Sequence, residues 1–151
     1  KKPISYLKTG FNLTQPQFSA DGRWVAYTSN ESGQFEIYIQ SFPEPRGKLQ
    51  VSTGGGLFPR WRRDGKELFY LAPDEKLMAV SIESKGVSLQ FSNPTALFET
   101  HLPNAFSAVT GFRQQYDVTA DGQRFLMNTA SKQTAEVPIT VVLNWTAGLK
   151  K

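Results

Sequence analysis

The sequence predicts an all-β fold assembled from a repeated hairpin unit, and three observations carry this prediction. Among the 151 residues, an Asp-Gly pair occurs three times between runs rich in apolar residues, at Asp21, Asp64 and Asp121. Glycine tolerates a positive φ and the Asp side chain bonds nearby backbone, so this pair is a strong hairpin signal. No segment shows a helical period of useful length. With 39% hydrophobic and 20% charged residues, the composition is that of a soluble globular domain.

The three units share more than their turn. A bulky residue stands three positions before each aspartate, namely Phe18, Trp61 and Val118. Apolar residues stand four, five and six positions after each aspartate, as in the Leu-Phe-Tyr run at 68–70. The second strand of each hairpin is therefore apolar on both faces, which is typical of a strand in the middle of packed layers.

Further strands are predicted from the short apolar runs that follow, over residues 35–39, 49–51, 77–82, 96–98 and 139–143. Four short strands within about 40–45 residues correspond to one blade of a β-propeller. We therefore predict that residues 1–151 form a single β-propeller segment with three four-stranded antiparallel blades.

The predicted boundaries follow from this repeat. The first blade covers residues 15–52, the second 57–99 and the third 113–146, and a loop insertion of residues 100–112 separates the last two. The third blade lacks its outer strand in this chain. Residues 4–10, which begin with an Ile-Ser-Tyr-Leu run, are predicted to be an orphan outer strand that belongs to a preceding blade.

Three blades leave two apolar faces to be covered, because a propeller ring closes with typically about 4–8 blades. Two ways of covering them stay open. In the first, the chain is half of a six-bladed ring, and a second copy completes the ring as a homodimer whose residues 4–7 supply the missing outer strand. In the second, the chain is a piece of a longer parent chain that carries the other blades.

The best binding candidates lie on the predicted innermost strand of the second blade. Arg60, Trp61 and Arg62 belong to the densest basic cluster of the sequence, and Arg113 precedes the third inner strand as a weaker candidate. Because arginine recognises carboxylates bidentately, a carboxylate-bearing or acidic peptide is the expected guest. The competing interpretation is that Trp61 belongs to the core and that the arginines pair with nearby acids.

Other polar residues indicate no catalytic chemistry. The three aspartates are interpreted as turn residues and not as metal ligands, because a glycine follows each of them. His101 is the only histidine, and no Gly-x-Ser-x-Gly or His-Glu-x-x-His motif accompanies it. The glycine run at 54–56 lacks the Lys-Ser/Thr of a phosphate loop and is interpreted as a flexible link between blades.

Composition narrows the classes of partner. Cysteine is absent, and the net charge of +4 is a mild basic excess. Apolar runs such as residues 141–143 are short, far below the roughly 20 residues of a membrane-spanning helix. The sequence therefore predicts no enzyme activity, no cofactor, no metal site, no nucleic-acid partner and no membrane insertion of this segment.

The first unit carries a specific resemblance. Its pattern Pro-x-Phe-Ser-x-Asp-Gly-Arg-x-Val-Ala-Tyr-x-Ser-Asn at 16–30, followed by Glu-Ile-Tyr-Ile at 36–39, is similar to the WD-repeat-like blades of TolB-type propellers. It also resembles the C-terminal propeller regions of bacterial membrane-anchored serine/threonine kinases, and the segment from Pro138 to Trp145 is similar to how those chains end. The resemblance covers about residues 4 to 146.

The resemblance implies a function as well as a fold. TolB-like blades bind other envelope proteins, and the kinase propellers look like extracytoplasmic sensor domains. The expected function is thus a non-catalytic module for protein-protein interaction or ligand sensing, with a protein or peptide partner and a periplasmic or extracytoplasmic location. The alternative is the gating propeller of a prolyl-oligopeptidase-like peptidase whose catalytic domain is absent from this chain.

Overall fold

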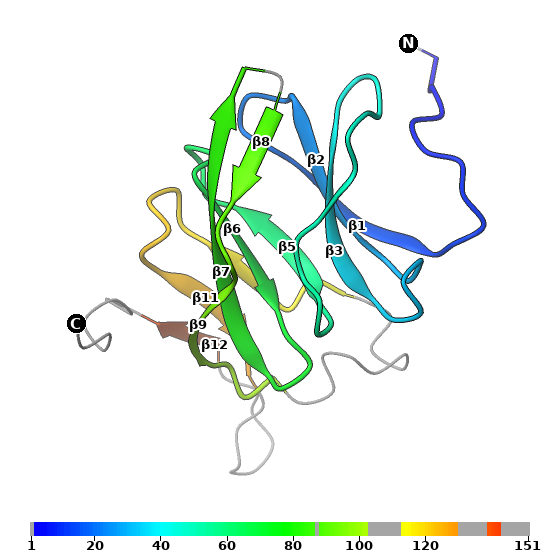
Figure 1. Ribbon diagram of the computed structural model, residues 1–151. Helices are drawn as coiled ribbons and strands as arrows, with labels where there is room; N and C mark the ends of the chain where they lie inside the picture. Colours follow the sequence, from blue (N-terminus) through cyan, green and yellow to red (C-terminus); the bar gives the residue numbers. More distant parts are fainter. Residues whose placement is uncertain (1, 87, 103–112, 130–138, 143–151) are drawn as a thin grey trace.

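The computed structural model describes residues 2–86, 88–102, 113–129 and 139–142, which form antiparallel β-sheets and no helix (Figure 1). The all-β prediction is confirmed. The first sheet has the strand order β1-β2-β3-β4, so each strand pairs with its neighbour in sequence. Its strands are β1 (Leu13–Phe18), β2 (Trp24–Ser29), β3 (Glu36–Ser41) and β4 (Leu49–Gln50).

The second sheet has one strand more than predicted. It contains β5 (Leu57–Trp61), β6 (Glu67–Leu71), β7 (Lys76–Lys85), β8 (Ser88–Phe91) and β9 (Thr95–Glu99). The first half of β7 pairs with β9 and its second half pairs with β8. Strand β8 was not predicted because the polar residues around Gly86 interrupt the apolar alternation.

The third sheet has the order β10-β11-β12 in the described part of the chain. Its strands are β10 (Tyr116–Val118), β11 (Phe125–Asn128) and β12 (Ile139–Val142). The predicted loop insertion and third blade extend over residues 103–112, 130–138 and 143–146, which lie outside the described residues.

Residues 4–10, which are predicted to be an outer strand of a preceding blade, form no strand in the single chain described here. These residues pair with no strand among those described, and they run along the outer side of the first sheet (Figure 1). Tyr6 and Leu7 pack against Val25 and Tyr27 of β2, and the Tyr6 hydroxyl donates to the carbonyl of Ser41. Tyr6 and Leu7 therefore cover a sheet face and do not extend a sheet edge.

The sheets pack face to face, and β6 contributes to both interfaces. Leu68 and Tyr70 belong to the apolar cluster shared with the first sheet, whereas Phe69 and Leu71 belong to the cluster shared with the third. All four side chains are buried, which confirms the predicted apolar character of both faces. Strand β11 differs, because Leu126 is 47% exposed on the face of the third sheet that turns away from the second.

Hydrogen bonds between the inner strands join the three sheets. Gln15 of β1 and Phe58 of β5 both have positive φ angles, 55° and 58°, at irregular positions of their strand pairs. The Gln15 side-chain oxygen accepts a hydrogen bond from the Phe58 amide at 2.8 Å, and the Tyr116 hydroxyl of β10 donates to the Phe58 carbonyl at 2.8 Å. Strained backbone of this kind persists where surrounding contacts over-determine it.

The glycine link between the first two sheets is packed and not flexible, contrary to the prediction. The Gly55 amide donates to the buried Glu36 carboxylate at 2.9 Å. A Cβ on Gly56 would lie 2.7 Å from Ile37 Cγ1 and 2.8 Å from Ser52 Oγ. Glycine is needed here because the backbone approaches its neighbours too closely for a side chain.

Candidate functional site

The Asp-Gly pairs are turn residues, as predicted. In each turn the glycine amide bonds the carbonyl three residues back at 2.9 Å, and φ of the glycine is 68° or 73°. The aspartate side chain accepts from the backbone amide two residues on, at 3.1 Å for Asp21 and 3.0 Å for Asp64 and Asp121. These carboxylates are occupied by local hydrogen bonds, and no acidic or histidine cluster suited to a metal occurs among the described residues.

Trp61 and Arg62 are held by contacts within the fold. The Trp61 indole packs against the cluster between the first two sheets and donates to the Gln17 carbonyl at 3.2 Å. The Arg62 guanidinium is bound by Asp64 at 2.7 Å and by Glu67 at 2.6 Å. Its hydrogen bonds to Asp64 raise the pKa of Arg62 and lower the pKa of Asp64. The interpretation that Trp61 is core and that nearby acids pair the arginine holds for these two residues.

Arg60 is placed differently. Its side chain is 20% exposed, and Nε is buried without a hydrogen-bond acceptor among the described residues. Its ion-pair partner is Asp117 of β10, with 3.5 Å between Arg60 Nε and Asp117 Oδ1. This distance is longer than a hydrogen bond. Because Asp117 is 70% exposed, water competes with this contact.

A groove of about 370 Å³ opens beside Arg60 at the junction of the second and third sheets. Its lining combines polar and apolar side chains of the inner strands, namely Arg60, Gln114, Gln115, Tyr116, Asp117, Leu126, Met127 and Asn128. Burial raises the pKa of Tyr116 well above its usual range, so this phenol stays neutral. The groove therefore presents one incompletely paired cation and its acidic partner, Asp117, among neutral hydrogen-bonding groups.

Arg113 does not join this site. It is exposed, and none of the contacts among the described residues connects its guanidinium with Arg60. Asp117 was missed by the sequence analysis although a signal for it exists. Aligning the units on their Asp-Gly pairs puts Asp117 at the position of Arg60, and equivalent positions on neighbouring inner strands lie close together.

His101 is exposed at the end of the second sheet, with a φ of 51°. The described part of the chain contains no helix long and apolar enough to cross a membrane.

Face-to-face antiparallel sheets joined at their inner strands define an all-β protein of the β-propeller type. Two solved structures have a similar fold at 13% identity. A putative 6-phosphogluconolactonase from Bacteroides uniformis matches with a TM-score of 0.57 over 91% of this chain and 42% of its own. An oligogalacturonate lyase from Vibrio parahaemolyticus matches with a TM-score of 0.52 over 81% of this chain and 31% of its own.

The sequence is similar to one particular protein of this type. The Tol-Pal system protein TolB of Desulfosudis oleivorans is 38% identical over 53 residues, which are 35% of this chain and 12% of the relative. The chain thus matches only a small part of that relative's length. No protein-family model matches the chain.

Proposed function

We propose that this chain is a non-catalytic protein-interaction module that binds a carboxylate-bearing peptide in the groove beside Arg60. The observation that carries the proposal is the arginine itself. The Arg60 side chain is four-fifths buried, and among the described residues its Nε has no hydrogen-bond acceptor. Its ion pair with Asp117 is long, and the Asp117 side chain is largely exposed to solvent. A peptide carboxylate supplies the short, charge-assisted hydrogen bonds that Asp117 does not.

The test uses a fluorescein-labelled peptide of alternating glutamate and glycine, with the glutamine peptide as its control. Anisotropy titrations of the 151-residue chain are expected to show saturable binding of the glutamate peptide alone. Arg60→Gln removes the charge and is expected to weaken binding about 10- to 150-fold, the equivalent of about 1.5–3 kcal/mol for a hydrogen bond to a charged group. Arg63→Gln is the matched control, because Arg63 is exposed and adjacent.

Asp117→Asn separates the proposed role from a general charge effect. It removes the carboxylate that competes with the peptide, so it is expected to tighten binding. Equal affinity of the unmodified chain and Arg60→Gln, or equal binding of the glutamine peptide, rejects the proposed function.

We further propose that the three sheets are blades of a larger ring, outside the cytoplasm as in TolB-like proteins. Residues at equivalent repeat positions support this proposal. Phe69 of the second unit is fully buried between sheets, whereas Leu126, its equivalent in the third unit, is 47% exposed. Trp61 of the second unit is packed, whereas Phe18, its equivalent in the first unit, is 57% exposed. Both exposed residues lie on outer faces. A second copy or further blades of a parent chain cover such faces. Sedimentation at micromolar concentration is expected to give a dimer mass, and a monomer rejects the second copy.

A further inference from the structure

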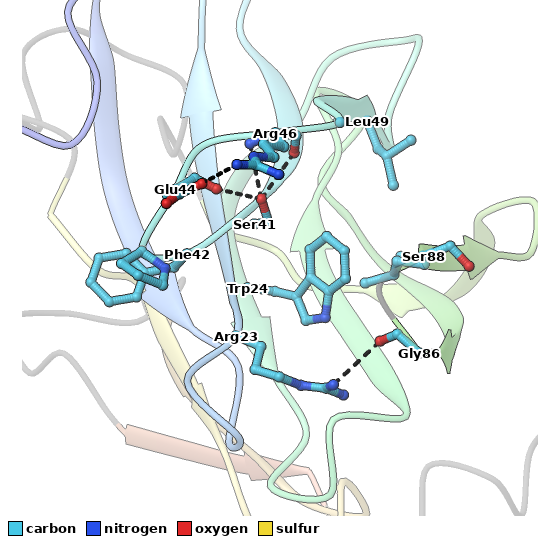
Figure 2. Close-up of a pocket in the computed structure, with 12 residues that line it drawn as sticks. Arg23, Trp24, Ser41, Phe42, Glu44, Arg46, Leu49, Gly86 and Ser88 are labelled. Atoms are coloured by element: carbon cyan, nitrogen blue, oxygen red, sulfur yellow. Dashed lines mark hydrogen bonds and ion pairs between the residues drawn. The ribbon is translucent and has the colours of Figure 1, made fainter.

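A second cleft shares no lining residue with the groove at Arg60 and lies between the loop after β3 and the β7–β8 hairpin. It has a volume of about 660 Å³ (Figure 2). Trp24 lies between the two, with Leu49 and Ser88 on one side and Arg23 below it in this view. The cleft is formed by residues of two sheets, and its volume lies within the range of ligand-binding pockets, about 300–1,000 Å³.

The walls of the cleft are apolar. Trp24 is 6% exposed and Leu89 is 8% exposed, and both belong to the cluster between the first two sheets. Leu49 of β4 is half-buried against the same cluster. The Arg23 guanidinium closes one end, because it donates to the Gly86 carbonyl at 3.3 Å and to Ser84 Oγ at 3.2 Å.

The indole nitrogen of Trp24 is a buried donor without an acceptor among the described residues. The equivalent nitrogen of Trp61 donates to a backbone carbonyl at 3.2 Å, so the fold satisfies one tryptophan and not the other. An indole N–H can only donate. Leaving such a group buried and unpaired destabilises the protein. An occupant that presents an oxygen acceptor to Trp24 removes this cost.

Both strands that border the cleft are sheet edges. Among the strands that the structure describes, β4 pairs with β3 alone and β8 pairs with β7 alone. In an antiparallel ladder, opposite residues alternate between pairs that exchange backbone hydrogen bonds and pairs that do not. The hydrogen bond from Ser92 N to Ser81 O makes Ser81 and Ser92 a bonded pair, so Ser84 and Leu89 are a non-bonded pair. In that alternation the backbone N–H and C=O of Leu89 point away from β7, toward the open edge. Open edges of this kind pair with extended peptides.

The charges at the rim add a preference. Two arginines, Arg23 and Arg46, and one glutamate, Glu44, line the cleft. The Arg46 side chain is 80% exposed, and its guanidinium bonds only Glu44 among the described residues. The Arg23 guanidinium is held by Asp21 and by the β7–β8 hairpin. Because an exposed ion pair is weak, Arg46 can exchange Glu44 for an acidic residue next to the apolar group that enters the cleft.

We propose that this cleft binds an extended peptide segment of a partner protein, which places one large apolar side chain beside Trp24 and Leu49. The carbonyl next to that side chain accepts the Trp24 N–H, and an acidic neighbour lies at the Arg46 rim. This site is separate from the groove at Arg60, and it does not depend on the function proposed for that groove.

The probe is an acetylated, amidated pentapeptide of threonine, aspartate, phenylalanine, threonine and threonine, in that order. The indole N–H signals of the ¹⁵N-labelled chain report binding, and Trp24→Phe assigns the signal of Trp24. The phenylalanine peptide is expected to shift this signal saturably. The same peptide with alanine in place of phenylalanine is expected to bind at least about tenfold more weakly, because it buries far less apolar area.

Two variants locate the binding. Trp24→Phe keeps an aromatic ring and loses the donor. Its affinity, followed by the backbone amide signals that the peptide shifts, is expected to fall about 3- to 10-fold. Leu49→Glu alters a half-exposed side chain, which preserves folding, and is expected to abolish saturable binding. Arg60→Gln is expected to leave this binding unchanged, so its outcome is independent of the glutamate-peptide experiment.

Three results would overturn the proposal. The Trp24 signal stays unmoved by the phenylalanine peptide, the alanine peptide binds equally well, or Leu49→Glu binds with unchanged affinity. The first and second results need no variant, so a folding defect in Trp24→Phe does not obscure them.

Discussion

Replacing Glu36 by alanine tests how the first two sheets are joined. Its carboxylate is 1% exposed and accepts hydrogen bonds from Gln34 Nε2 at 2.6 Å, from Gly55 N at 2.9 Å and from the Ser52 hydroxyl. Gln34 is exposed and can turn to water, but Ser52 and Gly55 are buried. Glu36→Ala therefore leaves two buried donors unpaired, at about 1–3 kcal/mol each.

Removing a buried carboxylate also relieves its desolvation, which offsets part of this loss. We expect a net loss of about 3 kcal/mol, a large share of the roughly 5–15 kcal/mol that stabilises a typical domain. Glu36→Gln retains one oxygen acceptor and is expected to lose less, about 1–2 kcal/mol.

The assay is urea unfolding followed by tryptophan fluorescence, with Glu44→Ala as the control. The Glu44 side chain is 69% exposed, so its removal is expected to change the free energy of unfolding by less than about 0.5 kcal/mol. If Glu36→Ala proves as stable as Glu44→Ala, the carboxylate does not hold the link, and the reasoning from buried donors fails.

Three more predictions concern stability. Gly56→Ala is expected to lower the free energy of unfolding by about 1–3 kcal/mol through overpacking. Gly54→Ala is the control and is expected to change little, because a Cβ there meets nothing within 4 Å. Equal stability of the two variants contradicts the close approach at Gly56. Tyr116→Phe deletes a buried hydrogen bond to β5 and is expected to cost about 1 kcal/mol in urea unfolding; no loss rejects the inter-sheet bond as a stabilising contact.

The third concerns acid. A serine hydroxyl lowers the pKa of Asp21 from 3.8 to about 2, so its stabilisation is present above pH 3.8 and is lost as the pH falls toward 2. With the side chain 45% exposed, the effect is about 1 kcal/mol after screening, and Asp21→Asn is expected to remove this pH dependence; an unchanged acid profile contradicts it.

The candidate site was only partly predictable. The sequence analysis selected Arg60 and Arg62 as equals because both belong to one basic cluster. They differ because Arg62 lies within reach of Asp64 and Glu67 in its own hairpin, whereas Arg60 faces Asp117 of another sheet at 3.5 Å. Local partners can be predicted from sequence spacing, and partners from another sheet depend on how the sheets pack.

The sequence by itself determined the hairpins, because turn formation depends on neighbouring residues: Asp and Gly satisfy each turn within a span of a few residues. It also determined the apolar faces of β2 and β6, because side chains alternate between the two faces of a strand and every second residue shares a face. The cleft at Trp24 was decided only by the tertiary structure. Arg23 meets Gly86 across 63 residues of sequence, and no local pattern encodes where two separate sheets converge or which buried donor their packing leaves unpaired.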